Sequence, residues 1–270
     1  MTPAPQTAGS DVDWSTAKGC ADEPTIRRFI ESVGGVLVDK VHPNPDFENA
    51  DFLFEEAQIV IELKILESEF GEHPNFEKKV VSLGAKTALQ FGLGPFLRSE
   101  GKAGAFYQRG LLELFRAPLA RITKKASSQI KVTRARLGMP EAKGVLWCVN
   151  DNFREVRPTT VVGLLSRILG GSGSGIDAFV YLTNHYVEFP DDPYVRIVWA
   201  PVYRDSEDES LRRFVNWLGR AWFDFCEAEE EPADSRIEGD DLTLDGGVVV
   251  KSKRRTYYLD PSSPGAVRRS

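Results

Sequence analysis

The chain has few of the residues that cross-link proteins or hold soft metal ions. It contains 3 cysteines, 3 histidines and 2 methionines in 270 residues. Cys20, Cys148 and Cys226 are odd in number and far apart in the sequence. This pattern predicts neither a disulfide framework nor a zinc cluster.

Long hydrophobic runs are also missing. No segment approaches the roughly 18 to 20 uncharged apolar residues that a membrane span needs, so we expect no membrane partner. Residues 1–20 are rich in Pro, Thr and Ser and have neither the cationic start nor the apolar stretch of a signal peptide. We expect this N-terminal segment to be disordered and the protein to be cytoplasmic.

Charge is unevenly distributed around a net value of −6. Residues 205–245 contain fourteen acids and four arginines, whereas residues 114–140 contain seven basic residues and no acid. A basic helix of this kind either contacts phosphate groups or is an ordinary solvated face. If it binds nucleic acid, the candidate contacts are Arg121, Lys124, Lys125 and Lys131.

The order of predicted elements indicates an α/β fold with a central mixed sheet flanked by helices. Asp22 and Pro24 favour the start of a first helix, and Gly34 and Gly35 favour its end. The pattern predicts helices over 23–33, 108–137, interrupted or kinked near Pro118, and 160–169. Strands are predicted over 36–41, 144–149, 177–182 and 195–200, besides a hairpin between the first strand and the second helix.

The expected organisation is one main domain over residues 21–226. Residues 72–110 look like an insertion into its minimal core. Residues 227–270 read as an acidic linker followed by a basic C-terminal tail. Asp245-Gly246-Gly247 is a candidate turn of a small hairpin in this last segment.

Three charged residues interrupt the two apolar segments of the predicted hairpin. Asp51 begins the first segment, and Glu62 and Lys64 lie in the middle of the second. Glu62 and Lys64 are two residues apart and therefore share a face of a strand. With Glu56 and Ala57 as the loop, Leu53 faces Val60 and Asp51 comes opposite Glu62. Two carboxylates roughly 5 Å apart require a cation or a proton between them.

At these residues the chain resembles the PD-(D/E)XK, or restriction endonuclease-like, nuclease superfamily. The matching pattern is Asp51, ten intervening residues, and then Glu62-Leu63-Lys64. The resemblance implies a core of helix, three strands, helix and strand. It also implies phosphodiester hydrolysis with Mg²⁺ or Mn²⁺, held by Asp51 and Glu62. Lys64 would then orient the attacking water or stabilise the developing charge.

The resemblance also implies helical residues near the site. Glu31 is the match on the first helix, and Gln129 is the match on the helix after the hairpin, with Lys125 one turn earlier. One branch of the superfamily has Gln-x-x-x-Tyr there, but this chain has Thr133 at the aromatic position. Asp46 is a rival for the first acid, and Asp51 is preferred because it begins an apolar run.

The function that follows is metal-dependent cleavage of DNA, with RNA as an alternative substrate. The other interpretation of the fold is a catalytically inactive member that binds nucleic acid or a protein partner. A homodimer is compatible with either. The plainest alternative is that Glu62 and Lys64 form a solvated surface pair on an amphipathic strand. The sequence does not choose among cleavage specificities, or between one metal ion and two.

Overall fold

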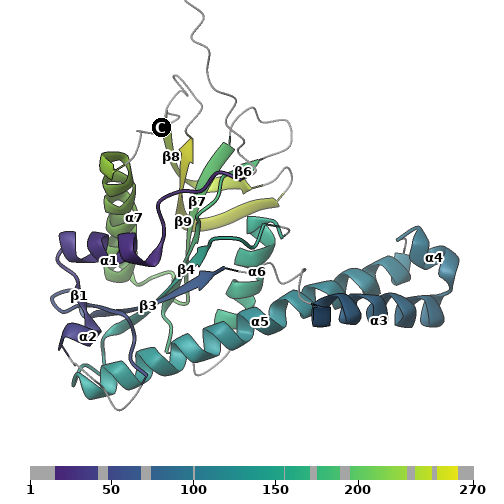
Figure 1. Ribbon diagram of the computed structural model, residues 1–270, viewed down its shortest axis with the longest axis horizontal. Coiled ribbons are helices and arrows are strands. Elements are labelled where there is room, and N and C mark those ends of the chain that lie inside the picture. The colour runs from purple at the N-terminus through teal and green to yellow at the C-terminus, as the bar shows by residue number, and fades with distance from the viewer. Residues whose placement is uncertain are drawn as a thin grey trace, which may run out of the picture.

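The structure is a computed structural model of the chain (Figure 1). It describes residues 16–41, 48–67, 74–99, 101–154, 156–170, 175–188, 195–229, 235–244 and 248–260, the last two ranges as backbone only.

A mixed β-sheet forms the centre of the molecule. Its strands lie in the order β1-β2-β3-β4-β5-β7-β9-β8, and β6 pairs with β7. The β3–β4 and β4–β5 pairs are parallel, and the other pairs are antiparallel. The strands are β1 (Val36–Leu37), β2 (Phe52–Phe54), β3 (Ile59–Leu66), β4 (Lys143–Asn150), β5 (Ala178–Thr183), β6 (Val187–Glu188), β7 (Val195–Tyr203), β8 (Ser235–Leu244) and β9 (Val248–Asp260).

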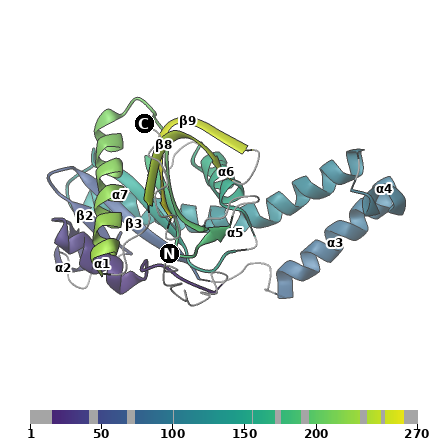
Figure 2. The ribbon, with the colours of Figure 1, turned by 90° about the horizontal axis from the view of Figure 1, so that it is seen from above.

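Helices cover both faces of this sheet, as predicted for an α/β protein. Helices α1 (Glu23–Ser32) and α7 (Glu209–Glu229) pack on one face, where Phe29, Trp147 and Trp222 are buried together. Helices α5 (Gly101–Arg136) and α6 (Pro158–Leu169) pack on the other. In Figure 2 the sheet lies between α7 and α6. The two faces therefore have separate hydrophobic cores.

Helix α1 begins and ends where the sequence predicts. The Asp22 side chain accepts a 2.7 Å hydrogen bond from the Thr25 N–H, and Pro24 lies in the first turn. Gly34 follows the helix with φ of 85°, a conformation that glycine adopts without strain. This helix packs Ile26, Phe29 and Ile30 into the core.

The first predicted strand is shorter than expected. Only Val36 and Leu37 pair with β2, and Val38–Val41 form a single helical turn, α2. The partner strand explains the difference, because β2 is just three residues long and the Val38 N–H bonds the Asp51 carbonyl at 2.9 Å, where the pairing ends. The prediction of a strand through residue 41 was wrong, since tertiary pairing overrode the β-propensity of the segment.

Helix α5 is continuous through Pro118, so the interruption, one of the two outcomes predicted there, is wrong. A proline inside a helix costs about 3 kcal/mol. Packing on both sides of Pro118 offsets this cost: Leu119 is fully buried, and the Phe115 ring lies 5.7 Å from that of Phe153. The helix also begins earlier than expected, at Gly101.

The region predicted as an insertion forms a helical arm. It consists of α3 (Pro74–Phe91), the short α4 (Leu93–Leu97) and the first turns of α5. Figures 1 and 2 show this arm projecting away from the sheet. The aromatic pairs Phe76–Phe115 and Phe96–Tyr107 hold α3 and α4 against α5.

Part of the region expected as linker and tail belongs to the sheet instead. Helix α7 continues to Glu229, and β8 and β9 pair with each other and with β7. Leu244 pairs with Val248, so the hairpin predicted around residues 245–247 is confirmed by its flanking strands. The turn residues themselves, like residues 1–15 and 261–270, lie outside the described part of the chain.

A disulfide joins Cys20 to Cys226, although the number and spacing of the cysteines indicated no disulfide framework. The two residues are 206 positions apart in the sequence, but their Cα atoms lie 6.5 Å apart because α1 and α7 pack on the same face. Cysteine counting could not reveal this pair, since one further cysteine, Cys148, is buried and free. Within the described ranges, no helix is long and apolar enough to cross a membrane.

Candidate active site

The β2–β3 hairpin has the predicted register. Leu53 pairs with Val60, and Phe52 pairs with Ile61. The Gln58 N–H donates to the Glu55 carbonyl at 3.0 Å, closing a tight turn in which Gln58 adopts a φ of 54°. This register places Asp51, one residue before β2, beside Glu62. The even loop length inferred from the sequence is therefore confirmed.

Asp51, Glu62 and Lys64 come together on the face of the sheet that α5 covers. One carboxylate oxygen of Asp51 accepts a 2.7 Å hydrogen bond from the Leu63 N–H. The Glu62 side chain is completely buried, and its Oε1 is ion-paired with the Lys64 Nζ. The Lys64 side chain is 23% exposed. The site therefore combines a fully buried acid with a lysine side chain that is partly exposed to solvent.

Burial and like charge oppose ionisation of the two carboxylates. Desolvation, together with the neighbouring Asp51 carboxylate, raises the pKa of Glu62 to about 8, although Lys64 opposes the rise. Desolvation also raises the pKa of Asp51, and this rise is opposed by the Leu63 N–H and by Lys64. A proton or a cation at the pair would relieve this repulsion.

The donor set fits a hard divalent cation. Glu62 Oε2 is buried and has no hydrogen-bond donor among the described residues, so a ligand atom is available there. Oxygen ligands from carboxylates are those that Mg²⁺ and Mn²⁺ prefer. The described residues contain no group of three or more His, Cys, Asp or Glu side chains able to share a metal ion. Two carboxylates with water or phosphate oxygens are nevertheless a usual Mg²⁺ environment.

Helix α5 holds the backbone that leads into Asp51. The Gln129 side-chain amide donates a 2.9 Å hydrogen bond to the Asn49 carbonyl. One turn later, the buried Thr133 hydroxyl accepts a 2.7 Å hydrogen bond from the Ala50 N–H. Gln129 thus borders the site through backbone contact. Gln129 was predicted from the sequence to lie near the site, whereas Thr133 was noted only as a departure from an aromatic pattern.

The two second-tier candidates lie in surface ion pairs. Lys125 is 3.2 Å from Glu48, and both side chains are largely exposed. Glu31 pairs with Lys40 on the outside of α1, and the structure does not bring it to the trio. The α1 residue whose charge acts on Asp51 is Arg27, which sequence reasoning missed. Asp46 lies outside the described residues.

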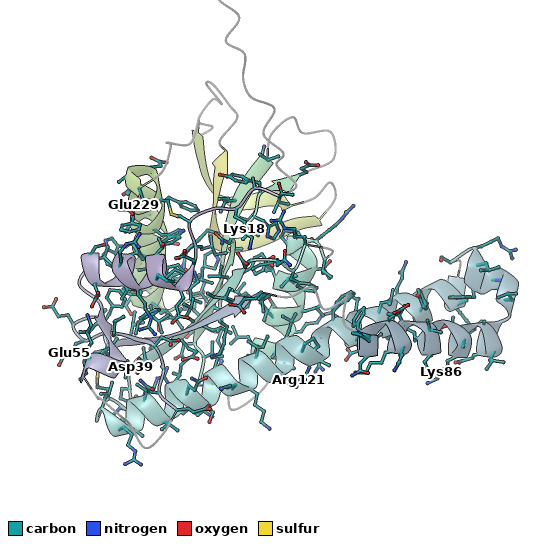
Figure 3. The ribbon with its side chains drawn as sticks, in the orientation of Figure 1. Lys18, Asp39, Glu55, Lys86, Arg121 and Glu229 are labelled. Carbon is teal, nitrogen blue, oxygen red and sulfur yellow. A yellow bond between two sulfur atoms is a disulfide. The ribbon has the colours of Figure 1, made fainter. Side chains whose placement is uncertain are left out.

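The remaining candidates lie on the outer surface of α5. Arg121, Lys124 and Lys131 are exposed, and Figure 3 shows Arg121 pointing away from the sheet. Arg134, in the same basic segment, has a structural role instead. It forms a 2.6 Å ion pair with Asp177, whose carboxylate also accepts the Gly144 N–H at 2.8 Å. Basic composition alone did not distinguish the exposed candidates for phosphate contact from a residue that forms a structural ion pair.

Comparison with models of known protein families, with curated proteins and with solved structures finds no match to this chain. The residues of the site and their arrangement are therefore the basis for inferring its function.

Proposed function

We propose that the protein is a metal-dependent nuclease that hydrolyses phosphodiester bonds in DNA. The observation that carries the proposal is the pairing of Asp51 with the buried Glu62, beside Lys64, in a fixed hairpin register. A buried like-charged pair is costly, and structural sites rarely retain one without a cation or a proton. A phosphodiesterase site gives this arrangement a use.

The order of elements supports a restriction endonuclease-like core. Helix α1, the antiparallel strands β1, β2 and β3, helix α5 and the parallel strand β4 follow in the order that the resemblance implies. The arm made by α3, α4 and the start of α5 is inserted between β3 and the part of α5 that covers the sheet. Fold analogy raises the expectation of this activity but does not supply the chemistry, which the site residues must provide.

Each site residue has a distinct role in this proposal. Asp51 and Glu62 would hold Mg²⁺ or Mn²⁺, which when bound would neutralise the scissile phosphate and acidify a water molecule. The Leu63 N–H fixes the Asp51 carboxylate, so the first ligand is positioned by the backbone of β3. Gln129 and Thr133 position the same carboxylate indirectly, through the Asn49–Ala50 backbone.

In this proposal, Lys64 contacts the substrate. Its ammonium group bonds Glu62 and its side chain is partly exposed, so it would contact a phosphate oxygen or the attacking water from within the site. A cation aimed at charge that develops in the transition state is an effective form of electrostatic stabilisation. Arg121, Lys124, Lys125 and Lys131 would contact other phosphates along the substrate.

One observation favours a second candidate function. Lys64 Nζ already lies against Glu62 Oε1 in the metal-free protein, where it opposes part of the repulsion between the two carboxylates. A non-catalytic member of the fold would keep such a pair for stability and use the basic helix only for binding. Titration with Mg²⁺ and Mn²⁺ followed by calorimetry separates the two functions, because only the nuclease requires the cation.

The test is a cleavage assay on linear and supercoiled DNA with Mg²⁺ or Mn²⁺, repeated on RNA. We expect cleavage by the unmodified protein and loss of it in Glu62→Gln and in Lys64→Met, with circular dichroism unchanged. Glu55→Gln is the matched control, because Glu55 lies in the same hairpin but is exposed, as Figure 3 shows. Full activity in both site variants would refute the proposal. Cleavage of RNA but not of DNA would mean that the substrate is RNA.

A further inference from the structure

Five basic residues of α5 form a straight row along the helix. Lys102, Arg109, Arg116, Lys124 and Lys131 follow one another at spacings of 7, 7, 8 and 7 residues. Two turns of an α-helix contain about 7.2 residues, so these side chains emerge on one face, about 11 Å apart. All five residues are exposed.

The row extends from the sheet to the end of the arm. Lys102 and Lys131 are 29 residues apart, which corresponds to about 44 Å along a helix. The sole acid in α5, Glu113, lies 3.5 Å from Arg116 in an exposed pair that contributes little. On the neighbouring helix α3, Lys86 lies over the Phe106 ring of α5 at 5.8 Å and adds a cation beside the row. Figure 3 shows Lys86 and Arg121 along the same edge of the molecule.

We propose that this row is a docking surface for double-stranded nucleic acid and that it requires a duplex of about 13 base pairs for full contact. The length follows from a 44 Å row and a rise of about 3.4 Å per base pair. A rigid helix with evenly spaced cations matches a stiff duplex, which meets all five without losing conformational freedom. A flexible single strand would pay an ordering cost at each contact.

The row serves binding rather than cleavage. Gln129 faces the Asn49 backbone, whereas Lys131, two residues later, projects from a different side of α5. The inference deepens the proposed function and rests on it for the identity of the ligand as nucleic acid. Helix α7, which contains four acids and three arginines, lies on the opposite face of the sheet from α5, so its acids do not repel a duplex docked on the row.

A membrane surface fits the row less well. Basic helices that bind membranes insert an apolar face into the lipid boundary. The apolar side of α5 is already packed against the sheet and against α3. The large exposed hydrophobic residues of the described ranges lie on other elements, with Leu89, Leu93 and Leu97 near the end of the arm. Charge without an available apolar face favours a duplex.

The test measures duplex binding in EDTA, where no hydrolysis occurs, for lengths from 6 to 24 base pairs, a range chosen around the predicted threshold. We expect the salt dependence of binding to steepen with length and to level off near 13 base pairs. For the double variant Lys102→Gln/Arg109→Gln, the salt dependence should level off near 7 base pairs, because the remaining row begins at Arg116. On a long duplex at 0.1 M salt it should bind up to about 60-fold more weakly.

The matched control is Arg28→Gln/Arg213→Gln, which removes two exposed cations from α1 and α7. It should change neither the duplex length at which the salt dependence levels off nor the affinity for a long duplex. Equal salt dependence at all lengths, equal loss in the control, tighter binding of single strands, or binding to anionic phosphatidylserine vesicles instead of duplex would each overturn the proposal. Length-dependent binding without cleavage would support the docking row and refute the nuclease activity. Cleavage without length-dependent binding would support the nuclease activity and refute the docking row.

Discussion

The Asp51 carboxylate accepts its hydrogen bond from the backbone N–H of Leu63, the residue between Glu62 and Lys64. The first acid of the site is thereby attached to the strand that supplies the other two charges. Because the hairpin register fixes this contact, any movement of β2 along β3 would separate the two carboxylates. The geometry of the site is thus a property of the hairpin.

Asp51→Asn should abolish metal-dependent cleavage while the protein stays at least as stable as before. The substituted amide keeps an oxygen that can accept from the Leu63 N–H but removes the charge that would hold a cation. We expect an activity loss beyond the roughly 10- to 100-fold typical of residues that only orient a ligand. Asp51→Leu is the contrasting variant, since it leaves the Leu63 N–H without its acceptor and should cost about 1–3 kcal/mol in urea unfolding. Equal stability of these two variants would contradict the role given to this hydrogen bond.

Glu62 should make the metal-free protein less stable as the pH rises. The ordinary pKa of a glutamate is 4.5, and burial with Asp51 nearby raises the pKa of Glu62 to about 8 in the folded state. Between these values the folded protein holds a proton that the unfolded chain has lost. Stability from this group is therefore lost between about pH 4.5 and 8, by an amount on the order of a few kcal/mol.

The measurement compares the unmodified protein with Glu62→Gln in EDTA across this pH range. We expect Tm of the variant to exceed that of the unmodified protein increasingly as the pH approaches 8. Taking the difference between the two proteins cancels groups such as His185, whose pKa burial lowers to about 4. At pH 8, added Mg²⁺ should raise the Tm of the unmodified protein but not that of Glu62→Gln, which narrows the difference between them. A pH-independent difference in Tm would show that Glu62 ionises normally.

Local patterns in the sequence predicted the elements whose causes are local. The cap at Asp22 and the alternation of β3 with its even loop gave α1 and the hairpin register correctly. The site trio followed from that register. By contrast, the strand expected through Val41 depended on the length of its partner β2, which no pattern within the segment reveals.

Contacts between distant segments set the features that were missed. Thr133 lies on an apolar stripe of α5, and its partner, the Ala50 N–H, is 83 residues away. A polar residue in such a stripe was the available signal, although its partner could not be named. Cys20 and Cys226 give a similar case, because their pairing depends on how α1 and α7 pack. The charge of Arg27 reaches Asp51 only through the placement of α1.

Thr133→Val should destabilise the protein and weaken the site together. The variant leaves the Ala50 N–H buried without its acceptor, at a cost of about 1–3 kcal/mol. Because Ala50 precedes Asp51, we also expect weaker Mg²⁺ binding by calorimetry, and Thr133→Ser should restore both properties. Thr123→Val is the matched control, since the Thr123 hydroxyl donates only to Leu119 O within the same helix. Unchanged Mg²⁺ binding in Thr133→Val would mean that α5 packs against the sheet without positioning the site.

The Cys20–Cys226 disulfide predicts the number of accessible thiols and a response to reductant. In denaturant without reductant, thiol titration should find the single free thiol of Cys148, and after reduction it should find all three. Because the link closes a loop of 206 positions, its loss should lower the free energy of unfolding by about 2–5 kcal/mol. The double variant Cys20→Ser/Cys226→Ser should match the reduced protein in urea unfolding and should not change further when reductant is added. Three reactive thiols in the unreduced protein would mean that the pair does not form. The packing of α1 against α7 would then rest on noncovalent contacts, such as those of Phe29 with Trp222 and Phe225.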